Sequence, residues 1–170
     1  MKHRQDPEPE TSDSQMDQIG TRGQVRESTG TEPVGINCKA FLIHPSEVDA
    51  IWPHVEGHLA KATPHSEGEM LPEDMKPLLE KAEMQLWIAV EDGNVLAAMV
   101  TQHIPYPRKR VLRVVSIGGG DMNKWFPFYP ELENYAKSLG CSHLEAWGRK
   151  GWGKILKGWT NSYHIFTKEI

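Results

Sequence analysis

Apolar residues recur along the chain with two periods, and these periods separate the expected helices from the expected strands. One stripe follows the i, i+3, i+4, i+7, i+11 spacing of an amphipathic helix and consists of Val48, Ile51, Trp52, Val55 and Leu59. Ser46 is the expected N-cap of this helix, and Pro53 inside the stripe is expected to kink it. A strand is expected before the helix, over residues 36–44, and a shorter helix after it, over residues 72–83.

The clearest local pattern is a hairpin. Two β-rich runs, residues 85–91 and 95–103, flank an Asp-Gly-Asn turn. Pro105 and Pro107 are expected to end the second run, because proline cannot donate to a strand ladder. Side chains alternate along a strand and both faces of the first run are apolar, so the hairpin is expected at the centre of the fold, covered on both sides.

Strands and helices alternate after the hairpin. The expected strands cover residues 110–117, 142–147 and 162–170. The expected helices cover residues 128–139 and 152–159, and Gly140 is the expected residue just beyond the first of them. Antiparallel strands therefore come first and strand–helix–strand units later, which predicts an α/β fold with a mixed sheet and helices on both faces.

The first 34 residues differ in composition from the rest of the chain. They contain no aromatic residue and no leucine, and they are rich in Glu, Asp, Ser, Thr, Gln and Gly. Such a segment cannot bury enough apolar surface to offset its chain entropy. We therefore expect a disordered tail over residues 1–34 and one folded domain over residues 35–170. The tail could serve as a tether, a docking segment or an inert extension.

Length and composition exclude several classes of protein. The 170 residues suffice for one ordinary domain plus a tail, and the 38% of hydrophobic residues suffice for a core. No apolar run approaches the roughly 18–20 residues of a membrane span, and the N-terminus lacks the apolar centre of a secretory signal. Cys38 and Cys141 form neither a disulfide framework nor a CxxC metal motif. These features predict a cytoplasmic protein with no membrane partner and no metal site.

Charge is distributed unevenly along the chain. The net charge is −3 over residues 1–35, −7 over residues 36–101 and +6 over residues 102–170, with a total of −4. The acidic total argues against a protein that coats nucleic acid. The basic last third suits an anionic ligand such as a phosphorylated cofactor, although surface charges can also cluster without a ligand.

Three segments together resemble a known fold. The hairpin QLWIAVEDGNVLAAMVTQ, the run RVLRVVSIGGG and the stretch ELENYAKSLGCSHLEAW are similar, in this order, to the second to fifth strands and the third helix of the GNAT superfamily of N-acetyltransferases. The family pattern E-x-x-A-x-x-x-G-C-x-x-L is matched by Glu133, Ala136, Gly140, Cys141 and Leu144. The resemblance covers about residues 36–170 and implies the GNAT fold, a mostly antiparallel central sheet with helices on both faces.

A narrower resemblance points to one group of such proteins. The segments GRKGW and YPRKRV and the glycine triplet are similar to small GNAT-like proteins encoded in phage and prophage genomes, some of them among head and tail genes. This resemblance implies a phage or prophage origin, with the host cytoplasm or the virion as the location and phage structural proteins as possible partners.

The GNAT resemblance implies a reaction and a cofactor site. The reaction would transfer an acetyl group from acetyl-CoA to an amine of a small molecule or a protein, within one ternary complex. Acetyl-CoA would bind between the fourth and fifth strands. The residues implied for cofactor binding are Val115, Ser116, Ile117, Gly118, Gly119, Gly120 and Asn123.

The chain departs from the family where the pyrophosphate of the cofactor should bind. The family pattern R/Q-x-x-G-x-G/A places backbone N–H groups at a helix N-terminus, but its positions fall on Asp121, Asn123 and Trp125, none of which is a glycine. The glycine triplet just upstream could supply an alternative nest of N–H groups or could be a flexible turn. Lys154 stands where many relatives have a tyrosine that protonates the leaving thiolate.

Candidate catalytic residues are few. Tyr163 is the nearest phenol, and Glu145 and Asp121 are candidates for the base that deprotonates an ammonium substrate, together with His103 and His143. Each of these can equally be structural or solvated. A pair of helical histidines, His54 and His58, is expected to be solvated rather than to bind zinc.

Two readings compete with the enzyme. The altered pyrophosphate loop, the lysine at the tyrosine position and the acidic tail fit a catalytically silent phage accessory or virion component that keeps only the fold. Nucleic-acid binding through the basic last third is the weakest hypothesis, because the whole chain is acidic and contains no familiar nucleic-acid-binding module.

Overall fold

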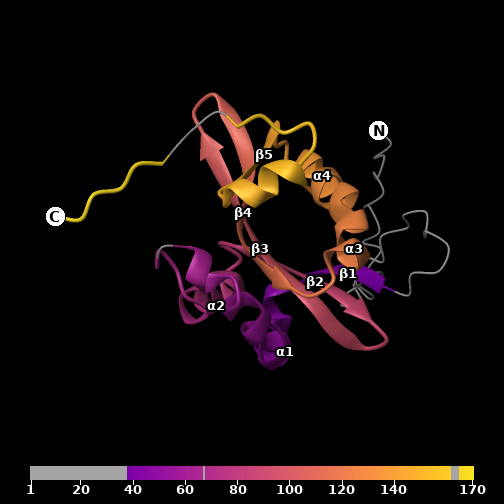
Figure 1. Ribbon diagram of the computed structural model, residues 1–170. Coiled ribbons are helices and arrows are strands. Elements are labelled where there is room, and N and C mark those ends of the chain that lie inside the picture. The colour runs from indigo at the N-terminus through magenta and orange to yellow at the C-terminus, as the bar shows by residue number, and fades with distance from the viewer. Residues whose placement is uncertain (1–37, 67, 162–164) are drawn as a thin grey trace, which may run out of the picture.

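One five-stranded sheet runs through the described part of the protein. The computed structural model describes residues 38–66, 68–161 and 165–170 (Figure 1). The strands lie in the order β1-β2-β3-β4-β5. They are β1 (Cys38–Ile43), β2 (Gln85–Glu91), β3 (Asn94–Tyr106), β4 (Lys109–Gly119) and β5 (His143–Ala146). The first four pair antiparallel, and β5 joins β4 in parallel. The expected mixed, mostly antiparallel sheet is confirmed.

Helices cover both faces of this sheet. The α-helices are α1 (Val48–Ala60), α2 (Pro72–Glu80), α3 (Met122–Trp125) and α4 (Tyr129–Ser138). The short 3-10 helices are η1 (Pro45–Glu47), η2 (Thr63–His65), η3 (Phe126–Phe128) and η4 (Lys150–Lys154). Figure 1 shows α1 and α2 on one side of the sheet and α3 and α4 on the other.

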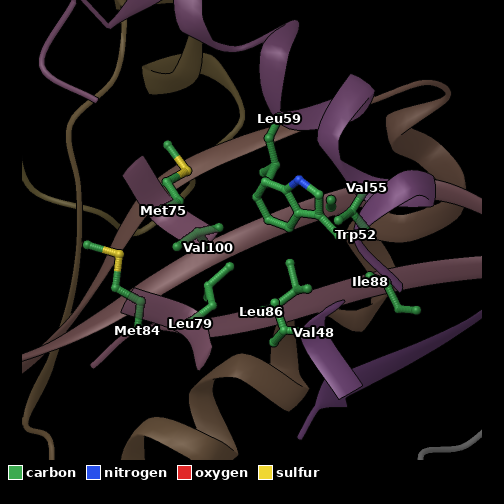
Figure 2. Packing of buried hydrophobic residues seen from close by; sticks show 11 residues of the cluster. Val48, Trp52, Val55, Leu59, Met75, Leu79, Met84, Leu86, Ile88 and Val100 are labelled. Carbon is green, nitrogen blue, oxygen red and sulfur yellow. The ribbon is translucent and has the colours of Figure 1, made fainter. Parts of the chain in front are cut away.

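The central hairpin is buried from both sides, as expected. On the first face, the apolar stripe of α1 packs with Met75 and Leu79 of α2 against Leu86, Ile88 and Val100 (Figure 2). On the second face, Trp87 packs with Leu112 and with Leu132 and Ala136 of α4. The buried indole N–H of Trp87 donates to Thr101 Oγ1 over 3.1 Å, so this polar group is satisfied within the core.

The second strand of the hairpin is longer than expected. Pro105 lies inside β3 and is opposite Arg110, because β3 and β4 form a second hairpin with Pro107 and Arg108 at its tip. This tip contains no glycine, and its one turn signal is Pro107, which suits the second position of a type I turn. The expectation that Pro105 ends the strand is therefore wrong.

The start of α1 and the end of the chain also differ from the expectations. Ser46 is not the N-cap, because η1 precedes α1 and His44 Nδ1 accepts the N–H of Ser46. The last helix is only the five residues of η4, and residues 165–170 contain no strand. Glycines at 151, 153 and 158 weaken a helix here, and Gly158 has φ +82°. Residues 162–164 lie outside the described part.

Candidate functional site

Strands β4 and β5 separate after four paired residues. Their pairing runs from Val111 opposite His143 to Val114 opposite Ala146. Strand β5 ends there, whereas β4 continues for five more residues, 115–119. Because no strand of the described ranges pairs with this stretch on the β5 side, its backbone forms an open edge. The first five residues implied for cofactor binding therefore lie together on this edge.

A β-bulge lies at the start of the open edge. Val100 is opposite Ser116 and Thr101 is opposite Val114, so Val115 is the extra residue of β4. Val115 has a partner in neither the β3 register nor the β5 register. A bulge leaves its extra residue outside the ladder and bends the strand. The backbone of Val115 is thus exposed to the space where β4 and β5 separate.

Glycines of the triplet allow close packing. A Cβ at Gly118 would overlap the backbone carbonyl of His58 at the end of α1, and a Cβ at Gly119 would lie 2.7 Å from the Cα of Ala97. A Cβ at Gly120 would meet nothing, but the N–H of Gly120 already donates to the carbonyl of Leu96 over 3.1 Å. The first two glycines therefore have a packing role. This role differs from both interpretations of the sequence, a nest of N–H groups and a flexible turn. Their contact with a cofactor stays a prediction.

The turn after the triplet is held against the sheet. The indole N–H of Trp125 donates to the carbonyl of Gly120 over 2.8 Å, and its ring packs on the buried cluster of Cys38, Ala89 and Ala97. Lys124 forms an ion pair with Glu91 over 2.6 Å, and this hydrogen bond raises the pKa of Lys124. Asp121 stays exposed, with φ +29°. The turn thus presents a negative charge beside the open edge.

A polar and aromatic cluster lies where β4 still pairs with β5. Arg113 Nε donates to Glu145 Oε1 over 2.6 Å, and Arg113 Nη2 donates to the hydroxyl of Tyr106 over 2.9 Å. The same guanidinium stacks on Trp147, 4.2 Å from the ring centroid. Glu145 is therefore engaged in an ion pair, and the structure does not present it as a free base.

Other expected residues are scattered. Asp121 is exposed at the turn and Lys154 is exposed in η4. His143 is also exposed, and its Nδ1 lies 2.8 Å from Ser142 Oγ. His103 Nε2 is buried without a hydrogen-bond partner in the described ranges. Tyr163 lies outside the described residues.

The two histidines of α1 have different surroundings. His54 is exposed, as expected. His58 is half-buried, and its Nε2 lies 3.0 Å from the carbonyl of Val95, so the expected solvated role is wrong for this residue. A carbonyl only accepts, which assigns the proton to Nε2. This bond and the contact between the His58 backbone and Gly118 fix the end of α1 on the sheet.

Tyr129 is a candidate that sequence reasoning missed. It packs against the second core cluster, and so does Val114, the last residue of β4 to pair with β5 before the open edge. Its hydroxyl accepts the indole N–H of Trp159 over 3.1 Å, and it also hydrogen-bonds with the Glu133 carboxylate, to which a phenol donates. Burial raises the pKa of Tyr129. The sequence carried no signal for it, because the family tyrosine was expected on the helix after β5.

Comparisons with known proteins support the fold. The sequence matches no protein-family model and no curated protein. A ribosomal-protein-alanine N-acetyltransferase from Brucella melitensis biovar Abortus 2308 superposes with a TM-score of 0.57 and 14% identity, over 78% of this chain and 99% of the other. An aminoglycoside N-acetyltransferase in complex with CoA gives a TM-score of 0.60 and 12% identity, over 82% and 99%.

A third solved structure agrees with these two. An aminoglycoside acetyltransferase from an uncultured soil metagenomic sample, in complex with sisomicin, gives a TM-score of 0.60 and 7% identity, over 79% of this chain and 97% of the other. The described part of the chain therefore has the GNAT fold. Within the same residue ranges, no helix is both long enough and apolar enough to span a bilayer.

Proposed function

We propose that the protein is an N-acetyltransferase that uses acetyl-CoA and an amine acceptor. Two observations at the same place carry the proposal. Val115 is the extra residue of a bulge and has no partner in β3, and the pairing of β4 with β5 stops at the residue before it. A strand edge opened in this way offers backbone donors and acceptors to an extended amide chain. The CoA complex of a structural neighbour with the same fold supports this choice of cofactor.

The residues present fit the pantetheine half of the cofactor better than the pyrophosphate half. The open edge over residues 115–117 would hold the pantetheine by strand-like hydrogen bonds. The pyrophosphate would meet the first-turn N–H groups of α3, Asn123 among them. Asp121 opposes an anion there, so the chain's own basic residues Arg149 and Lys150 would have to offset the charge.

The chain would contribute positioning and polarisation. When bound, acetyl-CoA supplies a thioester whose C–S bond breaks as the amine nitrogen bonds to the carbonyl carbon, with the amine proton lost and the sulfur released as a thiol. Backbone N–H groups at the bulge would stabilise charge on the carbonyl oxygen. The same groups would align the reactants, which supplies much of the rate in a direct transfer.

We expect Tyr129 to protonate the leaving sulfur. Its raised pKa keeps the phenol protonated through neutral and mildly alkaline pH, so it remains a donor there. Replacing Tyr129 with Phe should lower kcat by about tenfold, or about 1.4 kcal/mol, with little change in the KM for acetyl-CoA. Tyr135→Phe is the matched control, since this ring packs edge-on to Trp87 in the same cluster. Equal effects of the two variants would refute a proton-donor role.

We expect Asp121→Asn to tighten the binding of CoA. The exposed carboxylate lies at the turn beside the open edge, and asparagine tolerates the same positive φ. Removing the like charge should lower Kd by about three- to fivefold, or roughly 0.5–1 kcal/mol, and the gain should shrink in high salt. Asp92→Asn is the control, because Asp92 has φ +51° in the β2–β3 hairpin turn, away from the open edge. An unchanged Kd for CoA in calorimetry would show that the pyrophosphate does not bind at this turn.

A thermal-shift titration tests the proposed cofactor. Ligand present at 100 times its Kd stabilises a protein by about 2.7 kcal/mol. Acetyl-CoA should therefore raise the melting temperature, whereas ADP at the same concentration should have a smaller effect, because it lacks the pantetheine. No shift at millimolar acetyl-CoA would contradict the proposal. A phage origin rests on the narrower sequence resemblance alone. The silent accessory or virion role rests on the altered pyrophosphate loop, the lysine at the tyrosine position and the acidic tail, and the structural neighbours, which are acetyltransferases, do not favour it.

A further inference from the structure

A cavity that is open to solvent lies between the tip of the β3–β4 hairpin and the end of β5, and its lining is positive and aromatic. It has a volume of about 580 Å³. Its walls are Tyr106, Pro107, Arg108, Lys109, Glu145, Trp147 and Ile165. Ligand pockets typically have volumes of this order and combine apolar walls with a few polar groups. The proposed transfer has not used this cavity.

The cavity lies on the same face of β4 as Val115. Leu112 and Val114 pack toward α4, so the side chain of Arg113 points to the opposite face. Val115 packs against the cluster formed by α1 and α2, which is that opposite face. Glu145 and Trp147 meet the Arg113 guanidinium, so the cavity borders β4 below the bulge.

Along β4 and β5, the cavity is lined from the tip of the β3–β4 hairpin to Trp147, which is its lining residue nearest the bulge. Trp147 directly follows Ala146, the last residue of β5 to pair, whereas Lys109 is the first residue of β4. Five residue steps separate Lys109 from Val114, which is about 16 Å along a strand. A ligand that spans this distance must be extended.

The lining of the cavity has a net positive charge, because its acidic residue is paired and, within the described ranges, its basic residues are not. Glu145 is neutralised by Arg113, whereas Arg108 and Lys109 form no ion pair with a described acidic side chain. The Nζ of Lys109 lies 5.6 Å from the ring centroid of Tyr106. Such a lining repels a polycationic acceptor and attracts an anionic group near the hairpin tip.

The aromatic wall is held in place before any ligand binds. Arg113 stacks on Trp147 and donates to both Tyr106 and Glu145, so one side chain holds two walls of the cavity. Trp147 is 55% exposed although it is large and apolar. A rigid, exposed aromatic wall is typical of a surface that binds a partner's side chains at low entropic cost.

We propose that this cavity binds the acceptor, and that the acceptor is the N-terminal segment of an acidic peptide. This inference rests on the proposed acetyltransfer. The α-amine would lie near the bulge at Val115, and an acidic side chain at about the fourth or fifth position would meet Arg108 and Lys109. An extended peptide covers about 3.3 Å per residue, so four to five residues span the cavity. The positive charges of Arg108 and Lys109 disfavour a polycationic acceptor such as the sisomicin bound to one structural neighbour.

Two peptides with free N-termini test the proposal. The first is Ala-Ala-Phe-Glu-Glu-Ala-amide, and in the second both Glu residues are Lys. CoA release should be at least tenfold faster, as kcat/KM, with the Glu peptide. The double variant Arg108→Glu with Lys109→Glu should reverse the preference. Arg110→Glu is the control, because Arg110 lies on the opposite face, with its guanidinium near Gly140, and it should leave the preference unchanged.

A binding measurement separates failure of the inference from failure of the proposed function. The N-acetylated Glu peptide, labelled with a fluorophore at its C-terminus, needs no transfer and should bind at least tenfold more tightly than its Lys counterpart in fluorescence anisotropy. If the Glu peptide binds more tightly than the Lys peptide but neither is acetylated, the proposed acetyltransferase function is refuted and the proposal that the cavity binds an acidic peptide stands. Acetylation of both peptides at equal rates, or faster acetylation of the Lys peptide or of sisomicin, would overturn the inference.

Discussion

Replacing Gly118 with alanine is expected to destabilise the protein by about 3 kcal/mol. The added Cβ would overlap the backbone carbonyl of His58, and neither backbone can move aside cheaply. Gly118 lies in β4 opposite Ala98, and His58 belongs to a helix whose buried residues Val55 and Leu59 pack against the sheet. The substitution therefore has to separate α1 from the sheet.

Urea denaturation measures this effect, and Gly120→Ala is the matched control. A Cβ at Gly120 would meet no atom within 4 Å, so this variant should unfold within about 0.5 kcal/mol of the parent protein. At Gly118 the melting temperature should fall by about 10 °C. Similar stabilities for the two variants would show that close packing does not explain the glycine triplet.

Replacing Val115 with proline is expected to lower acetyltransfer at least 100-fold. Proline removes a backbone N–H at the bulge, and the loss of one preorganised donor to a developing oxyanion typically reduces kcat by about 100- to 1,000-fold. The position should tolerate the change in the fold, because Val115 is outside both strand registers. The free energy of unfolding should change less than it does in Gly118→Ala.

Val115→Ala separates the side chain from the backbone. The Val115 side chain packs against the α1 and α2 cluster, so alanine loses this contact but keeps the N–H. Its kcat should stay within about threefold of the parent value, in steady-state assays of CoA release with the Glu peptide. If alanine and proline lower kcat equally, the backbone donor has no role.

Local patterns in the sequence were sufficient for much of the fold. The helical spacing from Val48 to Leu59 and the Asp-Gly-Asn turn each encode structure through nearby residues, and both predictions are confirmed. The apolar residues on both faces of β2 correctly predicted burial from both sides of the sheet. These signals are local because periodicity and turn chemistry act within a few residues.

The remaining features depend on contacts between distant segments. The bulge at Val115 arises from the register between β3 and β4. The residue types near Val115 do not indicate that β4 has an extra residue there. The glycines at 118 and 119 reflect the approach of α1 and β3, which lie far from them in sequence. Tyr129 gains its partner from Trp159, thirty residues further along the chain. The family pattern brought attention to the correct strand, but it could not supply these contacts.

A titration of the 15N-labelled protein with acetyl-CoA, followed by the backbone amide signals, tests whether the open edge of β4 binds the cofactor. We expect saturable shifts that are largest for residues 115–119 and for the first turn of α3, and smaller shifts on β1 and β2. Shifts confined to other regions, or no shifts at millimolar acetyl-CoA, would show that the open edge of β4 does not bind the cofactor.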